Sequence, residues 1–201
     1  ATGESFASSR IAISGDDIVL TAAARRGTQG YSTYYYAKSG ASGGECTAAA
    51  TLNHNLANLA ALPEAMAATI DNSDVGLAYG RGGAGSPDVL RYGEARIGDG
   101  VGGWEDVAEP GKKVKVGSPD LAFHTHQGQE LSVLSYIDED GQVYVTIGTP
   151  VDWYRTAVAG GIGKDYTRLA ASGDTIHVTY DHKDSALASQ AKYFSCELSF
   201  E

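Results

Sequence analysis

The stretch from Leu169 to Leu198 reads LAASGDTIHVTYDHKDSALASQAKYFSCEL and decides the fold. A segment of small residues leads into a polar turn at Gly173, and an alternating segment, a longer polar loop and an aromatic segment follow. Alternation of apolar and polar residues predicts β-strands that are buried on one face. Glycine and aspartate between such segments favour tight turns. The stretch therefore predicts three antiparallel strands, at 168–172, 175–180 and 191–198.

Three upstream segments repeat this order of elements. They begin at Ile11, Met66 and Leu121 and read IAISGDDIVLTAAARRGTQGYSTYYYAK, MAATIDNSDVGLAYGRGGAGSPDVLRYGEA and LAFHTHQGQELSVLSYIDEDGQVYVTI. Repetition at about 45 to 55 residues, with four short strands in each unit, is typical of a β-propeller blade. We therefore predict an all-β fold, a four-bladed β-propeller.

The predicted blades cover residues 10–51, 63–108, 119–158 and 166–201 of a single domain that spans 1–201. A connector over 159–167 separates the last two blades, and blade four has three strands where the others have four. Trp104 and Trp153 open the fourth strands of blades two and three, and Phe6 occupies the same position relative to Arg10. We therefore predict that residues 2–8 supply the missing strand of blade four and close the ring, since closure removes exposed sheet edges.

The four inner strands share a pattern of small residues. An alanine occupies the same position in each strand, at Ala12, Ala67, Ala122 and Ala170. Side chains alternate between the faces of a strand, so Ser14, Thr69, His124 and Ser172 lie on the alanine face. The opposite face carries apolar residues such as Ile11, Ile13, Leu121, Phe123, Leu169 and Ala171. We expect the alanine face to line a narrow axial channel and the apolar face to pack on neighbouring sheets.

Aromatic residues also recur, at Tyr36, Tyr92 and Tyr193 in the third strands and at Tyr79, Tyr136 and Tyr180 in the second. Their recurrence from blade to blade predicts packing between blades rather than platforms for stacking sugars.

Several of these segments resemble the sialidase-like or BNR-type β-propellers, in particular bacterial extracellular repeat proteins. The segments are PEAMAAT and SPDLAF, DTIHVTY and DVGLAY, VLRYGEA and AKYF, and the closing GGW and DWY. The resemblance covers nearly the whole chain, and it implies a fold that carries glycosidases, lectins, lyases and scaffolds. The family's Asp-box, S-x-D-x-G-x-T-W, has no clean copy, because SGDTIHVTY lacks the glycine and the tryptophan. Nor can the arginine triad, tyrosine nucleophile with its glutamate, and acidic residue of the sialidases be assigned, so we do not expect a sialidase.

Composition limits the partners. A net charge of −10 argues against nucleic acid and anionic membranes, which require a basic face. No apolar run approaches the ~20 residues of a membrane span. The chain begins at Ala1, which is compatible with removal of a signal peptide, and we expect a secreted protein. Cys46 and Cys196 permit one disulfide, and both the paired and the free state remain open.

Charged residues at the starts of the inner strands form the main candidate site. Arg10, Asp120 and Arg168 should converge at the channel mouth. They are compatible with structural ion pairs, with bidentate binding of a carboxylate or another anion, or with acid–base chemistry at Asp120. The loops on the same face add further candidates: Arg25, Arg81, Tyr180, Asp181 and His182.

His124 and His126 lie two apart on one strand and could face the channel together. Spacing places no carboxylate near them, so the metal reading is weak and we predict no cofactor beyond an ion that the channel could hold. The sequence Asp138-Glu-Asp140-Gly is compatible with Ca²⁺ binding, but a tight hairpin turn is the favoured interpretation.

These observations favour a secreted binding module for carbohydrate or a small anionic ligand, bound at the channel mouth and the loop face. Two alternatives remain open. One is a glycan-processing hydrolase or lyase that uses Asp120, Arg10, Arg168, Tyr180 and Asp181. The other is a scaffold for protein interactions.

Overall fold

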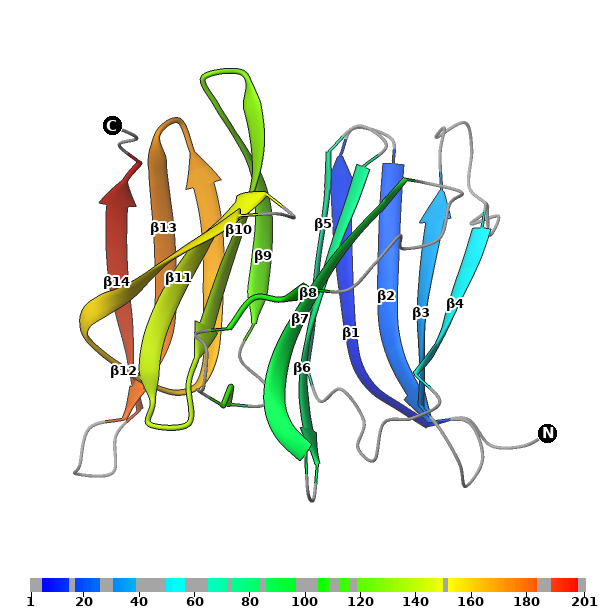
Figure 1. Cartoon of the computed structure of the whole chain (residues 1–201), viewed down its shortest axis with the longest axis horizontal. Helices are drawn as coiled ribbons and strands as arrows, with labels where there is room; N and C mark the ends of the chain where they lie inside the picture. Colours follow the sequence, from blue (N-terminus) through cyan, green and yellow to red (C-terminus); the bar gives the residue numbers. More distant parts are fainter. Residues whose placement is uncertain are drawn as a thin grey trace.

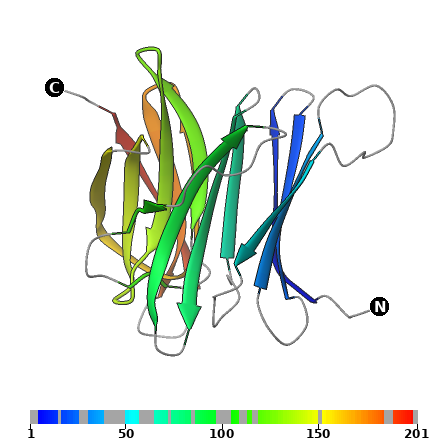
Figure 2. The same ribbon diagram turned by 45° about the vertical axis from the view of Figure 1, so that its right-hand side comes forward.

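The computed structural model of the chain is all-β. It describes residues 5–14, 17–25, 31–38, 50–56, 65–71, 74–83, 86–96, 105–108, 113–115, 119–149, 152–183 and 189–198. In these ranges the strands form three antiparallel sheets, which stand side by side in Figures 1 and 2. No helix in the described part of the chain could cross a membrane.

The first two sheets are simple meanders of four strands each. The first contains β1 (Ser5–Ser14), β2 (Asp17–Arg25), β3 (Tyr31–Lys38) and β4 (Ala50–Leu56). The second contains β5 (Ala65–Asp71), β6 (Asp74–Gly83), β7 (Ser86–Arg96) and β8 (Glu105–Asp106). Both sheets follow the strand order predicted for blades one and two. The predicted end of blade one at residue 51 is wrong, because β4 continues to Leu56.

The third sheet joins the last two predicted blades into one. Its strands are β9 (Asp120–His126), β10 (Gln129–Ile137), β11 (Gln142–Thr149), β12 (Asp152–Ser172), β13 (Thr175–Lys183) and β14 (Ser189–Glu197), in the order β14-β13-β12-β11-β10-β9. The first part of β12 pairs with β11 as far as Ile162, and the second part pairs with β13 from Gly163 onward. The predicted connector at 159–167 is therefore wrong, because this segment is the middle of a continuous strand.

Specific contacts explain why a glycine-rich segment continues as a strand. A Cβ on Gly163 would lie 2.6 Å from Cδ1 of Ile137, so a larger residue here would require the buried Ile137 side chain to move. The side-chain amide of Gln142 donates to the carbonyls of Val158 and Gly161, at 2.8 and 3.3 Å. These bonds satisfy backbone groups at the register shift, where the ladder leaves them without strand partners.

The turn between β10 and β11 confirms the hairpin interpretation of residues 138–141. Gly141 has a φ of 89°, and its N–H donates to the carbonyl of Asp138 at 3.0 Å. The Asp138 carboxylate, which is buried, accepts the N–H of Gln142 at 2.8 Å. The carboxylate therefore holds the turn in the way that aspartate commonly does.

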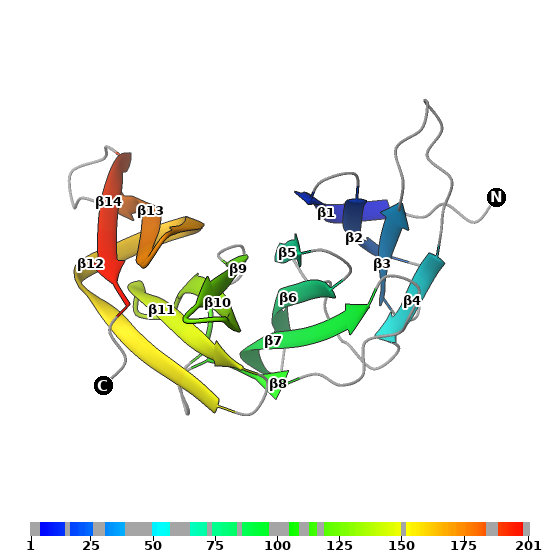
Figure 3. The same cartoon turned by 90° about the horizontal axis from the view of Figure 1, so that it is seen from above.

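The inner strands lie next to one another in the order β1, β5, β9 and β12. Seen from above, the sheets form an arc that is open between β1 and the β12–β14 part of the third sheet (Figure 3). The described strands thus form three sheets in chain order rather than the four separate blades that the repeats predict, and the row is not the closed ring that we expected.

The predicted closure by residues 2–8 is wrong for the part of this segment that the structure describes. Ser5 and Phe6 belong to β1 and pair with Arg25 and Ala24 of β2. β14 is an edge strand of the third sheet. Extending a local hairpin costs little loop-closure entropy, whereas pairing segments almost the length of the chain apart costs more, which explains the observed choice.

The apolar faces pack in one direction along the arc. Leu121 and Phe123 of β9 face the second sheet, where a Cβ on Gly76 would approach Phe123 Cζ to 3.0 Å. Leu169 and Ala171 of β12 pack on a core cluster that includes Val133 of β10. The equivalent residues of β1, by contrast, are exposed: Ile11 by 61% and Ile13 by 62%.

This result corrects the prediction that the apolar inner-strand face packs on a neighbour in every unit. It holds for β9 and β12 and fails for β1, because the sheet that would cover β1 in a closed ring lies across the opening.

The inner-strand alanines likewise differ in exposure. Ala12 and Ala122 are half-buried, Ala170 is exposed, and the side chain of Ala67 lies outside the described residues.

Among the residues whose burial the structure describes, the core forms two clusters on either side of β10, whose residues 131–137 are all buried. The first lies toward the second sheet and contains Ala78, Leu90, Tyr92, Val107, Val114, Leu121, Leu134 and Tyr136. The second lies toward β13 and contains Val133, Ile137, Val143, Val145, Val158, Ile176, Val178 and Tyr180. Burial of β10 on both faces makes it the centre of the packing.

We predict that isoleucine-to-alanine changes at Ile176 and Ile13 have unequal effects on the free energy of unfolding. Ile176 is fully buried, so Ile176→Ala should cost about 2–5 kcal/mol, whereas Ile13→Ala should cost less than about 1 kcal/mol, the scale of strand propensity. Urea denaturation of both variants measures the difference. A cost at Ile13 equal to that at Ile176 would contradict the open arc.

Candidate functional site

The structure brings together the three charged residues that were predicted to converge at the starts of the inner strands. Asp120 opens β9, and its Oδ2 accepts the N–H of Leu169 in β12 at 2.8 Å. Arg168 and Arg10 both lie close enough to lower the pKa of Asp120. The burial of Asp120 has the largest effect. It outweighs both the arginines and the backbone hydrogen bonds, so the pKa of Asp120 lies above its usual value.

The two arginines also act on each other. Burial, followed by the like charge of Arg168, lowers the pKa of Arg10, while Asp120 and Tyr166 act in the opposite direction. Arg10, Arg168 and Asp120 are therefore close enough to influence one another electrostatically. The two guanidinium groups stay protonated, as arginine does in proteins.

The open face is the surface of the β12–β14 part of the third sheet that is not packed on β10 and β11. Strand pairing places two rows of side chains across it, Arg168–Thr179–Tyr193 and Ala170–His177–Ser195. Arg168 is exposed, and its guanidinium lies 5.8 Å from the centre of the Tyr166 ring. The face therefore combines a cation with aromatic side chains.

A shallow cavity of about 220 Å³ lies on the open face beside Arg168. Its lining residues are Tyr166, Thr167, Arg168, Thr179, Tyr180, Asp181, Gln190 and Ala191. The predicted axial pocket is thus displaced, because the arc does not close around an axis. Arg168 belongs both to the charged cluster and to this cavity, so it links the two.

Three of the predicted ligand-binding residues have structural roles. The Asp181 carboxylate accepts the N–H groups of Asp165 and Tyr166 at 2.8–3.1 Å and so fixes the register shift of β12. His182 is paired through Nδ1 with the carbonyl of Ile162 at 2.8 Å. Tyr180 is buried in the second core cluster, as its predicted packing role requires.

Arg25 and Arg81 are distant in the chain from these contacts. Arg25 is the last residue of β2 and Arg81 lies in β6, but their side chains are not among those that the structure describes. Cys46 also lies outside them. Cys196 is a half-buried free thiol whose pKa is raised by burial.

Tyr193 is the functional candidate that sequence reasoning missed. It was assigned to packing between blades, yet it is 62% exposed on the open face. Its ring stacks on His177 at a centroid distance of 6.0 Å, and its hydroxyl is hydrogen-bonded to His177 Nδ1 at 2.7 Å. Tyr92, which occupies the same position in the second sheet, is buried as predicted. The exposure of Tyr193 follows from the open end of the row, which the recurrence of tyrosines along the sequence does not indicate.

A tyrosine–glutamate pair does occur, but it lacks the properties of a sialidase nucleophile. The Tyr92 hydroxyl is hydrogen-bonded to Glu94 and to Ser132. Burial, and then the bond to Glu94, raise the pKa of Tyr92 far above its usual value. A nucleophile requires the opposite, an accessible hydroxyl whose deprotonation is favoured. We therefore assign this pair to packing between the second and third sheets.

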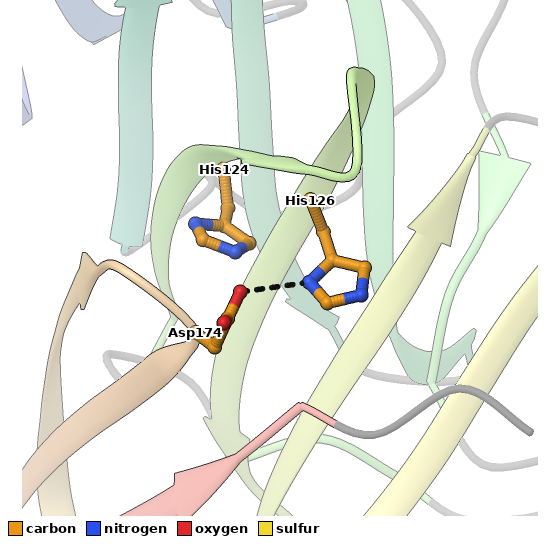
Figure 4. Close-up of side chains that lie close together, drawn as sticks. All are labelled: His124, His126 and Asp174. Carbon is orange, nitrogen blue, oxygen red and sulfur yellow. Dashed lines mark hydrogen bonds and ion pairs between the residues drawn. The ribbon is translucent and has the colours of Figure 1, made fainter.

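The two histidines of β9 have a carboxylate beside them that spacing did not reveal. His126 Nδ1 lies 3.0 Å from Oδ1 of Asp174, in the turn between β12 and β13. Figure 4 shows the rings of His124 and His126 on either side of this carboxylate. Burial, and then the proximity of His126, lower the pKa of His124, while Asp174 acts in the opposite direction.

No protein-family model and no curated protein matches the chain. Among solved structures, it is similar to a GH32 beta-fructofuranosidase of Bombyx mori in complex with sucrose, with 10% identity and a TM-score of 0.48 over 94% of this chain and 45% of that one. It is also similar to a glycoside hydrolase, with 10% identity and a TM-score of 0.47 over 98% of this chain and 72% of that one. The chain thus spans less than half the length of the first of these structural neighbours.

The raised pKa of Asp120 predicts a pH-dependent penalty on stability. Unfolded Asp120 titrates near its usual value of 3.8, and the folded carboxyl titrates above it. As the pH rises from 3.8 through the higher pKa of the folded carboxyl, the folded state binds more protons than the unfolded state. The stability of the wild type should therefore fall relative to that of Asp120→Asn in this pH range. Asparagine still accepts the N–H of Leu169. Melting temperatures of both proteins between pH 3.5 and neutrality measure the effect, and a gap that widens in favour of the wild type would contradict it.

Proposed function

We propose that the protein binds a carbohydrate that carries a carboxylate, on the open face around Arg168. The observation that carries this proposal is that Arg168 is exposed on a face that also presents two exposed tyrosines, the neighbouring Tyr166 (53%) and, two strands away, Tyr193 (62%). A guanidinium binds a carboxylate through two parallel hydrogen bonds. Tyrosine rings offer flat apolar surface with a polar end, which suits the C–H face of a sugar.

The size and chemistry of the cavity support a small polar ligand. Its volume of about 220 Å³ is below the ~300–1,000 Å³ of pockets for drug-sized molecules, which favours a single sugar ring. Thr179 and Gln190 line it and offer hydrogen bonds to hydroxyl groups.

The overall acidity of the chain favours selective binding over general attraction of anions. A net charge of −10 repels polyanions at long range, but charges beyond about 8 Å are screened at physiological ionic strength. An acidic sugar at contact distance from Arg168 therefore interacts mainly with this guanidinium and the groups next to it.

We extend the proposal to the architecture and the location. The four consecutive meanders support a relationship to sialidase-like propellers, with each meander equivalent to one blade. Acidic glycans are abundant outside cells, and this supports action there as a secreted, lectin-like module.

Hydrolysis is the second candidate function, and the raised pKa of Asp120 favours it, since a general acid must hold a proton. Glycoside hydrolysis requires a second carboxylate on the other side of the bond. Asp181 is the acidic residue that lines the cavity, and two backbone N–H groups already occupy its carboxylate. Binding without turnover is therefore the better supported function.

We predict that Arg168→Gln weakens binding of an oligogalacturonate by at least about tenfold, since hydrogen bonds between charged groups contribute on the order of 1.5–3 kcal/mol. Lys192→Gln is the matched control, because Lys192 is an exposed cation of the same sheet that projects to the other face. Isothermal titration with the oligogalacturonate and with a neutral galacto-oligosaccharide measures the effect.

Two outcomes would overturn the proposal: equal weakening of binding in both variants, or binding of the neutral sugar as tight as that of the oligogalacturonate. Release of reducing ends by the wild type, abolished in Asp120→Asn, would establish hydrolysis instead.

A further inference from the structure

A second cluster lies at the other end of the inner strands from Arg168 and Asp120. β9 has seven residues, which span about 20 Å, and it ends at His126, before a turn in which Gln127 and Gly128 have φ values of 51° and 82°. The turn between β12 and β13 contains Gly173, with a φ of 57°, and Asp174. These two hairpin ends meet, and they bring residues almost 50 positions apart into contact.

Three potential ligand atoms converge there. Each of the three residues offers one ligand atom, and these atoms all lie within 4.8 Å of one another; the residues are His124, His126 and Asp174. His126 Nδ1 and Asp174 Oδ1 are 3.0 Å apart. Two ligands on a tetrahedral ion at about 2.0 Å are separated by roughly 3.3 Å, so this spacing is close to that of a metal site. Figure 4 shows that the two rings and the carboxylate surround a common point.

An ordinary ion pair explains only part of this geometry. It accounts for His126 and Asp174, which are in direct contact. It does not account for His124, which is only 7% exposed and whose Nε2 has no hydrogen-bond partner in the described part of the chain. Buried polar atoms are nearly always satisfied, so an orphaned imidazole nitrogen in such a cluster points to a missing partner.

We propose that His124, His126 and Asp174 bind a divalent transition-metal ion of the Zn²⁺ class. Two imidazole nitrogens and one carboxylate oxygen match the ligands that zinc and its neighbours prefer, whereas Ca²⁺ and Mg²⁺ prefer sites made only of oxygen. The Asp174 side chain is 71% exposed, so the remaining coordination position opens to solvent and takes a water molecule.

The ion would cross-link the β9–β10 hairpin to the β12–β13 hairpin, and so join the two halves of the third sheet at their turns. A ligand that binds only the folded state raises its stability by mass action. Because the site lies at the opposite end of the inner strands from Arg168, metal binding does not depend on the proposed carbohydrate function.

The test uses the full chain after treatment with EDTA and dialysis. Co²⁺ and Zn²⁺ are added in turn, and visible absorption of tetrahedral Co²⁺ and isothermal titration with Zn²⁺ report binding. The wild type should bind one equivalent and melt at a higher temperature with metal. Asp174→Ala and His124→Gln should weaken binding at least tenfold and abolish the thermal shift.

His177→Gln is the matched control, because His177 lies on β13 of the same sheet outside the cluster, and it should bind as the wild type does. If His124→Gln does not fold, Asp174→Ala at its exposed position decides alone. Absence of saturable binding by the wild type, or equal affinity in the wild type, Asp174→Ala and His177→Gln, would overturn the proposal.

Discussion

Each unit of the third sheet packs the apolar face of its inner strand on the unit before it, and the rest of the structure depends on this directional packing. Leu121 of β9 contributes to the core shared with the second sheet, and Leu169 of β12 packs on the core around Val133. A row built in this way has two unequal ends. At one end Ile11 and Ile13 are exposed, with no sheet of the described residues packed on them, and at the other end Arg168 is exposed on the open face.

The same packing separates two kinds of chemistry along β9 and β12. At the beginning of these strands, Asp120 and Arg168 form a charged cluster that borders an exposed sheet face with tyrosines. At the end of these strands, two histidines of β9 approach the aspartate of the next hairpin. Neither group disturbs the core, because β10 between them is buried on both faces and provides the rigid support.

Much of the local structure was predictable from the sequence. The alternating segments around Val178 and Leu134 correspond to β13 and β10, and the D-G signal at Asp140 corresponds to a hairpin turn. The convergence of Arg10, Asp120 and Arg168 was also predictable, because aligned repeats place equivalent residues at equivalent ends of neighbouring strands.

Other features depend on contacts that local patterns do not encode. The glycines near Gly161 are typical of a loop, yet Gln142 and the close approach to Ile137 keep them in β12. Whether the ring closes, and which residue pairs with His126, both depend on contacts between segments that are far apart in the sequence, such as His126 and Asp174. Exposure of Tyr193 follows from the open end of the row, so a rule based on recurrence between blades could not reveal it.

The open end of the row can be tested directly by the accessibility of residue 13. In a chain whose native cysteines are replaced by serine, a single cysteine at position 13 or at position 176 is labelled with a maleimide under native conditions. The structure predicts that the thiol at position 13 reacts as fast as that of an unfolded peptide, while the thiol at position 176 is protected. Equal protection of both thiols in the monomer would show that a further sheet covers β1, and would contradict the open arc and the binding face that depends on it.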